Sequence, residues 1–222
     1  MLTTGLALAA ALAALAPRLP RLRDRYDSTA LQPITGTPAG NTASTPLDAE
    51  LRRWVMDGAG SGTTLSPWSL PVPPRALTFA VVPAAHRAAA HDFGYRLAGY
   101  HQLDGRSRLG GIAYRVGVQL RPLLWFLPRR DDEPWDDAWL TDIDAPRLAA
   151  LAGWQPRRPT LIVLDTPRQG VPLRVIDTLH ANVRRKDFRH PVRVLVLGDV
   201  ARDEFTPALR DDLCMLADQR NG

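Results

Sequence analysis

The stretch Pro159-Thr160-Leu161-Ile162-Val163-Leu164-Asp165 decides the fold of this chain. It is a continuous apolar run that ends in a carboxylate. Such a run is typical of a strand buried on both faces of a parallel sheet, because its two alternating sides must both meet apolar cover. A second run of the same kind, residues 192–199, follows a helical pattern. Strand, helix and strand at that separation predict a βαβ unit with a right-handed crossover.

Acidic residues at the ends of these two runs mark the expected site. Asp165 ends the first run and Asp199 ends the second. Ligands of open α/β sheets bind beyond the carboxyl ends of the strands. Asp165 and Asp199 are therefore candidate binding residues.

Composition and length agree with one α/β domain. The chain has 222 residues, 45% hydrophobic and 23% charged, which is typical of a globular protein. The net charge is +5, and 27 of the 28 basic residues are arginine. We do not take this bias as evidence for a nucleic-acid partner. The single cysteine, Cys214, excludes an intrachain disulfide and a Cys-based zinc cluster.

The chain before residue 46 is predicted to lie outside the domain. Residues 1–26 contain an apolar run, residues 6–16, followed by four arginines. The run is shorter than the roughly 20 apolar residues that cross a bilayer. A membrane anchor and a peripheral or soluble helix are both open interpretations. Residues 27–45 are rich in Ser, Thr, Pro and Gly, and are predicted to be a flexible linker.

Residues 46–222 are expected to form the mainly parallel sheet and its flanking helices. Pro46 begins a short helix, and residues 76–82 form a third buried strand that is followed by a helix to about Leu97. Apolar and polar residues alternate over residues 112–121, which predicts a half-exposed strand near an edge of the sheet.

The remaining elements are assigned by caps and spacing. Residues 131–139 are interpreted as an acidic loop with two tryptophans, and a short helix capped by Asp144 runs to Gly153. The helix between the two buried runs should turn Val175, Ile176, Leu179 and Val183 inward. A final helix is predicted from Thr206 onward, with Leu209, Leu213 and Leu216 inward and Cys214 within it.

Two segments resemble the P-loop NTPases of the bacterial STAND class. Residues 154–165 follow the family pattern WxPRRPTLIVxD, and residues 190–197 are close to the pattern hPVRxLLL. In that family the first segment carries the Walker B strand and the second carries the sensor strand. The resemblance implies a P-loop NTPase-like fold, with Asp165 in the position that directs magnesium beside ATP. By the same resemblance, Asp199 would lie just beyond the sensor strand.

The phosphate-binding part of that pattern is missing. A P-loop needs glycines, so that backbone N–H groups can cradle phosphate, and a lysine that reaches the β- and γ-phosphates. Residues 83–91 follow the third strand and contain neither, and Lys186 belongs to the helix beyond Asp165. Arg87 could supply charge there, but not a compact ammonium.

Three hypotheses for function remain open from the sequence. The first is a degenerate P-loop NTPase-like module that regulates or scaffolds protein partners in the cytoplasm, with weak or no binding of ATP and magnesium. The second is a protein–protein adaptor without a ligand, attached to the inner membrane through residues 1–26. The third is an active NTPase with an unorthodox phosphate loop.

Overall fold

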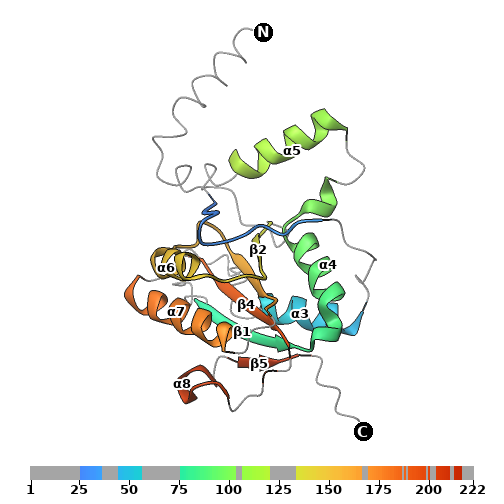
Figure 1. Ribbon diagram of the computed structural model, residues 1–222. Coiled ribbons are helices and arrows are strands. Elements are labelled where there is room, and N and C mark those ends of the chain that lie inside the picture. Colours follow the sequence, from blue (N-terminus) through green and yellow to red (C-terminus); the bar gives the residue numbers. More distant parts are fainter. Residues whose placement is uncertain are drawn as a thin grey trace, which may run out of the picture.

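The computed structural model describes residues 26–36, 45–56, 76–103, 107–120, 134–166, 170–186, 188, 190–198, 200, 204–210 and 213–216. Within these residues, five strands form one sheet in the order β2-β3-β4-β1-β5, and every neighbouring pair is parallel (Figure 1). The strands are β1 (Leu77–Val82), β2 (Asp136–Leu140), β3 (Thr160–Leu164), β4 (Val192–Leu197) and β5 (Leu213–Met215). The predicted α/β class with a parallel sheet is confirmed.

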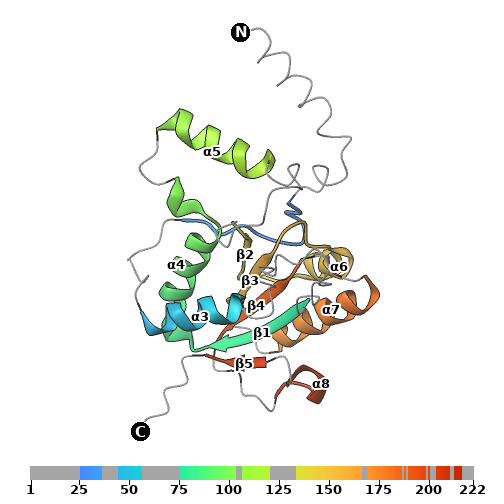
Figure 2. The ribbon, with the colours of Figure 1, turned by 180° about the vertical axis from the view of Figure 1, so that it is seen from behind.

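Helices cover both faces of the sheet, as the continuous apolar strands require (Figures 1 and 2). One face, here called the α4 face, packs against α3 (Pro46–Met56) and α4 (Arg87–Leu97). The opposite face, here called the α7 face, packs against α6 (Ala145–Gly153), α7 (Val171–Arg185) and the short α8 (Pro207–Arg210). Side chains alternate along each strand, so Val194 of β4 joins the α7 face and Leu195 joins the α4 face.

The predicted helix caps and inward faces are largely as expected. Asp144 caps α6, because its Oδ1 accepts a hydrogen bond from the N–H of Arg147 at 2.9 Å. Val175, Ile176 and Leu179 of α7 are fully buried, and Val183 is half-buried against the same core. Arg96 of α4 joins α3 through Asp48 at 2.6 Å.

The prediction of a loose linker is wrong for residues 27–36. Ala30, Leu31 and Ile34 are buried, and the N–H of Trp139 in β2 donates to the carbonyl of Gln32 at 2.8 Å. The segment therefore covers the outer edge of β2. Its few apolar side chains are buried at the rim of the core. Their burial offsets the conformational entropy that the segment loses when it becomes ordered.

The predicted edge strand at residues 112–121 is wrong, because this region contains helix α5 (Arg108–Leu120). Its residues alternate in polarity, but Leu109, Ile112 and Val116 also repeat at helical spacing. The edge of β2 that such a strand would have joined is already occupied by residues 26–36. Helix formation satisfies the backbone of α5 without a strand partner.

Two further predictions are corrected at the edges of the sheet. Part of the expected acidic loop is strand β2, where Asp136 is paired with Arg157 at 2.7 Å. The expected final helix stops at Arg210, and residues 213–215 pair with β1 as strand β5. Cys214 is therefore in a strand, not in a helix.

Several predicted features lie outside the described residues. They are residues 1–25, residues 37–44 of the predicted linker and Asp199. Among the helices that are described, none is both long and apolar enough to cross a bilayer.

The packing of residues 26–36 predicts that Leu31→Ala lowers the free energy of unfolding by about 2–5 kcal/mol, the usual cost of emptying a buried leucine site. Urea denaturation of the full chain measures the loss. Ser28→Ala, at an exposed position of the same segment, is the control and should change stability by less than about 0.5 kcal/mol. An unchanged midpoint in Leu31→Ala would show that this segment does not belong to the folded core.

Candidate functional site

The connections between strands diverge at the carboxyl end of the sheet, and the place where they diverge is here called the crevice. The chain leaves β1 through α4 on one face, whereas it leaves β4 through α8 on the other face. Ligands of open α/β sheets bind where the connections of neighbouring strands diverge in this way. Since β1 and β4 are neighbours, the crevice lies between their ends, beside the end of β3.

Arg87 and Asp165, both singled out from the sequence, meet at this crevice. Asp165 directly follows β3, and Arg87 is the first residue of α4. The Nη2 atom of Arg87 lies 2.6 Å from Oδ1 of Asp165. The Arg87 side chain is 62% exposed and that of Asp165 is 9% exposed. The Arg87 side chain therefore lies on the solvent side of the pair.

The second carboxylate oxygen of Asp165 is also engaged. Its Oδ2 accepts a hydrogen bond from the indole Nε1 of Trp139 at 3.2 Å. The Asp165 backbone N–H donates to the carbonyl of Leu140 at 2.9 Å, which fixes the residue against the end of β2. Both oxygens thus face donors in the protein. A magnesium ion would have to displace Arg87, because it binds as a cation to the same oxygens.

No cluster of three or more His, Cys, Asp or Glu side chains that could hold a metal occurs among the described residues. Asp165 is accompanied by an arginine and a tryptophan, neither of which binds divalent cations. The arrangement pairs the Asp165 carboxyl group with an arginine of the same chain. It does not offer the group of oxygen ligands that a magnesium ion prefers.

The turn between β1 and α4 is short. Pro83 and the 3₁₀ helix η2 (Ala84–His86) are all that separates Val82 from Arg87. Pro83 has no N–H to offer, and the N–H of His86 donates to the carbonyl of Pro83 at 2.9 Å. A phosphate cradle needs several free backbone N–H groups on a glycine-rich loop. Four residues of this composition do not form one.

The end of β4 also borders the crevice. The N–H of Gly198 donates to the carbonyl of Val82 at 3.0 Å, so the ends of β4 and β1 are held together. Gly198 has a φ of 151°, a conformation that suits glycine. Asp199 follows it but lies outside the described residues, so its predicted role remains a prediction.

Asp137 of β2 was missed as a candidate from the sequence. Its side chain points to the α4 face, where a Cβ atom on Gly94 would lie 2.7 Å from its Oδ2. Neither carboxyl oxygen has a hydrogen-bond partner among the described residues. Burial raises the pKa of Asp137 to about 7, the nearby Asp136 adds to the increase, and the N–H of Ala138 opposes it. Asp137 is therefore largely neutral in mildly acidic solution.

Tyr26 joins this region to the N-terminal segment. Its hydroxyl donates to the backbone carbonyl of Asp137 at 3.0 Å, and the guanidinium of Arg157 lies 5.6 Å from the centre of its ring. Burial is the main cause that raises the pKa of Tyr26. Strand alternation over residues 136–140 could have revealed Asp137, since Ala138 and Leu140 face one core and Asp137 faces the other.

The raised pKa of Asp137 predicts a pH-dependent stability. The folded state holds this proton more tightly than the unfolded state, so its stabilising contribution is complete below about pH 4. The contribution declines as pH rises toward 7, by at most about 1.4 kcal/mol per pH unit. Asp137→Asn should remove this slope in thermal melts taken between pH 5 and pH 8. Asp177→Asn, at an exposed carboxyl on α7, is the control and should keep the wild-type slope. An identical pH dependence in wild type and Asp137→Asn would contradict the raised pKa.

A scan with protein-family models found no match to this chain, and searches of curated proteins and of solved structures found none either. The resemblance to STAND NTPases therefore depends on residues 154–165 and 190–197 of the sequence. Function has to be inferred from the geometry of the Arg87–Asp165 pair and its surroundings.

Proposed function

We propose that this domain is a degenerate P-loop NTPase-like module that regulates or scaffolds other proteins and does not catalyse hydrolysis. The observation that carries the proposal is the contact between Arg87 and Asp165 at 2.6 Å. By the resemblance, Asp165 would direct magnesium beside phosphate, and its contact with an internal cation instead supports the proposal. We propose the P-loop ancestry from the sequence resemblance alone.

The ion pair explains how such a site could lose its ligand and remain stable. A carboxylate that directs magnesium would destabilise the fold once the metal is absent, because a largely buried charge needs a counter-charge. Arg87 supplies that counter-charge from the first turn of α4. The same position follows the turn in which a P-loop would hold its phosphate cradle.

The short β1–α4 turn supports the same proposal independently. Phosphoryl transfer depends on positioning and on charge stabilisation, with little covalent help from the protein. Pro83, Ala84, Ala85 and His86 supply neither the glycines nor the lysine for that task. Losing even one preorganised donor costs about 10²–10³ in kcat in well-studied enzymes. Losing the whole cradle should leave no measurable turnover.

Two alternatives remain as proposals. An active NTPase would require Arg87 to swing away from Asp165, and its exposed side chain has room to do so. An adaptor without any ligand would leave the crevice permanently closed by the pair. In either form we propose a protein partner and a cytoplasmic location, with attachment to the inner membrane as the second hypothesis from the sequence.

A phosphate-release assay with ATP or GTP and magnesium tests the proposal on wild type, Asp165→Ala and Arg87→Ala. We expect all three to release phosphate at the background rate, with thermal melts confirming that each variant is folded. Turnover in wild type that disappears in Asp165→Ala would overturn the proposal and establish an NTPase.

Two calorimetric titrations of the protein complete the test, one with magnesium alone and one with nucleotide and magnesium together. The ion pair predicts that Arg87→Ala exposes the Asp165 carboxylate, so magnesium should bind this variant more tightly than wild type. Asp165→Ala is the matched control and should bind no better than wild type. Equal magnesium binding by wild type and Arg87→Ala would show that Arg87 does not block the carboxylate.

A further inference from the structure

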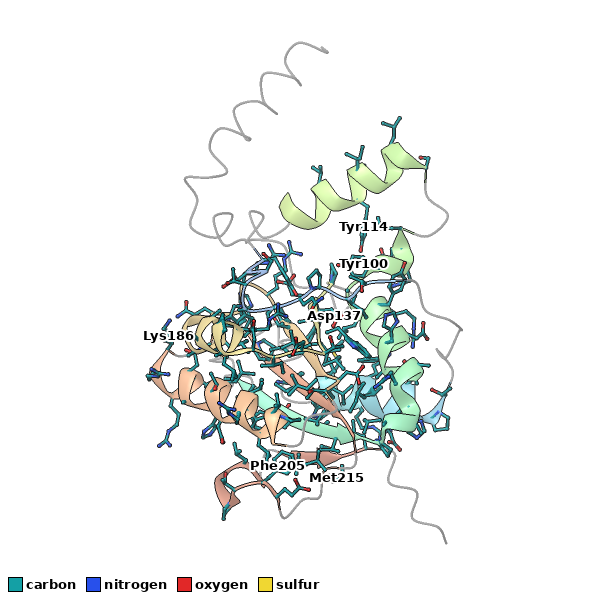
Figure 3. The ribbon with its side chains drawn as sticks, viewed as in Figure 1. Tyr100, Tyr114, Asp137, Lys186, Phe205 and Met215 are labelled. Atoms are coloured by element: carbon teal, nitrogen blue, oxygen red, sulfur yellow. The ribbon has the colours of Figure 1, made fainter. Side chains whose placement is uncertain are left out.

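Helix α5 stands away from the two layers that cover the sheet. In both ribbon views it lies beyond the segment 26–36, on the side away from the strands (Figures 1 and 2). Its inner side rests on the domain through Tyr114, whose hydroxyl would lie 2.7 Å from a Cβ atom on Gly99. Figure 3 shows Tyr114 pointing from α5 toward the body of the domain and Tyr100.

The outer side of α5 is apolar and exposed. Leu109 is 80% exposed, Ile112 is 59% exposed and Val116 is 47% exposed. Positions 109, 112 and 116 are spaced three and four apart, so they form one stripe along the helix. Tyr114 and Gly111 contact the domain from the other side, because a Cβ atom on Gly111 would lie 3.9 Å from Leu103. The stripe is therefore turned outward by the packing of the helix itself.

The charges of the chain are distributed unevenly along the sequence. Residues 105–130 contain six arginines and no acidic residue, and residues 1–26 contain four arginines and one aspartate. The rest of the chain has 18 basic and 22 acidic residues. The net positive charge of the protein is thus confined to the two stretches that are also rich in apolar residues. Such asymmetry is typical of a part that meets an anionic partner.

The two basic stretches join the domain at the same place. Tyr26 is the first described residue of the N-terminal segment. Its hydroxyl donates a hydrogen bond to the backbone carbonyl of Asp137, at the start of β2. A Cβ atom on Gly99 would lie 3.2 Å from Pro134, just before β2, and 2.7 Å from Tyr114 of α5. The connections to residues 1–25 and to α5 therefore leave the same end of the domain.

We propose that the stripe Leu109–Ile112–Val116 docks the domain on the surface of an anionic lipid bilayer. A helix with an apolar stripe, a basic composition and a length of about 20 Å lies in the interface and does not cross the membrane. Charge complementarity selects anionic headgroups, and the apolar side chains enter the boundary between headgroups and acyl chains. The run Leu123, Leu124, Trp125, Phe126 and Leu127 follows in sequence, with the residue types that gather at membrane interfaces.

A bilayer accounts for these observations better than a second copy of the chain. A second copy carries the same basic stretch, residues 105–130, and this stretch has no acidic residue to balance its charge. A flat anionic surface needs no matching groove and balances the positive charge that the sequence gives residues 105–130. The proposal does not depend on whether the crevice at Asp165 binds nucleotide.

Vesicle co-sedimentation of the full chain tests the docking. The probes are vesicles of phosphatidylcholine alone and of phosphatidylcholine mixed with phosphatidylglycerol. We expect binding to the anionic vesicles, weaker binding to the neutral ones, and release as salt is raised. The triple variant Leu109→Ser, Ile112→Ser, Val116→Ser should have an affinity for anionic vesicles that is lower by at least about tenfold. Met215→Ser replaces an exposed apolar residue on β5 and should bind as wild type does.

A fluorescent probe then reports whether α5 itself enters the lipid. After Cys214→Ser, Ile112→Cys is labelled with an environment-sensitive fluorophore, and Met215→Cys provides the matched control. Anionic vesicles should shift the emission to shorter wavelength at position 112 and leave it unchanged at position 215. No binding by wild type, or equal binding by the triple variant, would overturn the proposal. A dimer in solution that the triple variant dissociates, with no vesicle binding, would also overturn it and assign the stripe to a second copy.

Discussion

The structure depends on strand β4 being buried on both faces between β1 and β3. Such a strand forces helices onto both sides of the sheet, and right-handed crossovers decide which helix goes where. The chain moves from β1 to β2 across β4 and β3 with α4 on one face. It then returns through β3 and β4 with α6 and α7 on the opposite face. This reversal opens the crevice and brings α4 and the end of β3 together, so the contact between Arg87 and Asp165 is a consequence of topology.

One residue of β4 departs from this apolar pattern. Arg193 is fully buried and paired in register with Thr78 of β1. Its Nε donates to the carbonyl of Val55 at 3.1 Å, in the last turn of α3, and its Nη1 donates to the carbonyl of Val192 at 3.2 Å. The last carbonyls of a helix lack partners within it and carry partial negative charge. Arg193 satisfies one of them and so fixes α3 to the sheet, at the cost of burying a cation.

The sequence was informative wherever a segment is buried on two faces or carries a cap, as in β1, β3, β4, α6 and α7. It misled at the edges of the fold. Residues 112–120 fit both a period of two and a helix, and only the occupied edge of β2 decides between them. Strand β5 has three residues, too few for a pattern. Asp165 and Arg87 were both identified, but their contact depends on the strand order, which no local pattern contains. Asp137 was missed because a buried, unpartnered carboxyl contradicts the usual location of aspartate.

The connection between β1 and β2, residues 83–135, contains both features on which the functional proposals depend. It must pass over β4 and β3, and its helix α4 covers the α4 face together with α3. Its first helical residue, Arg87, contacts Asp165 at 2.6 Å. Beyond α4, the chain has more length than the crossover needs, and α5 projects from the domain with its apolar stripe outward. The short turn at the start of this connection has neither glycine nor lysine, while the residues beyond α4 form helix α5 with its exposed apolar stripe. We therefore propose two roles for one crossover, a P-loop-like site without its phosphate cradle and a contact with a membrane, because neither feature disturbs the buried strands beneath it.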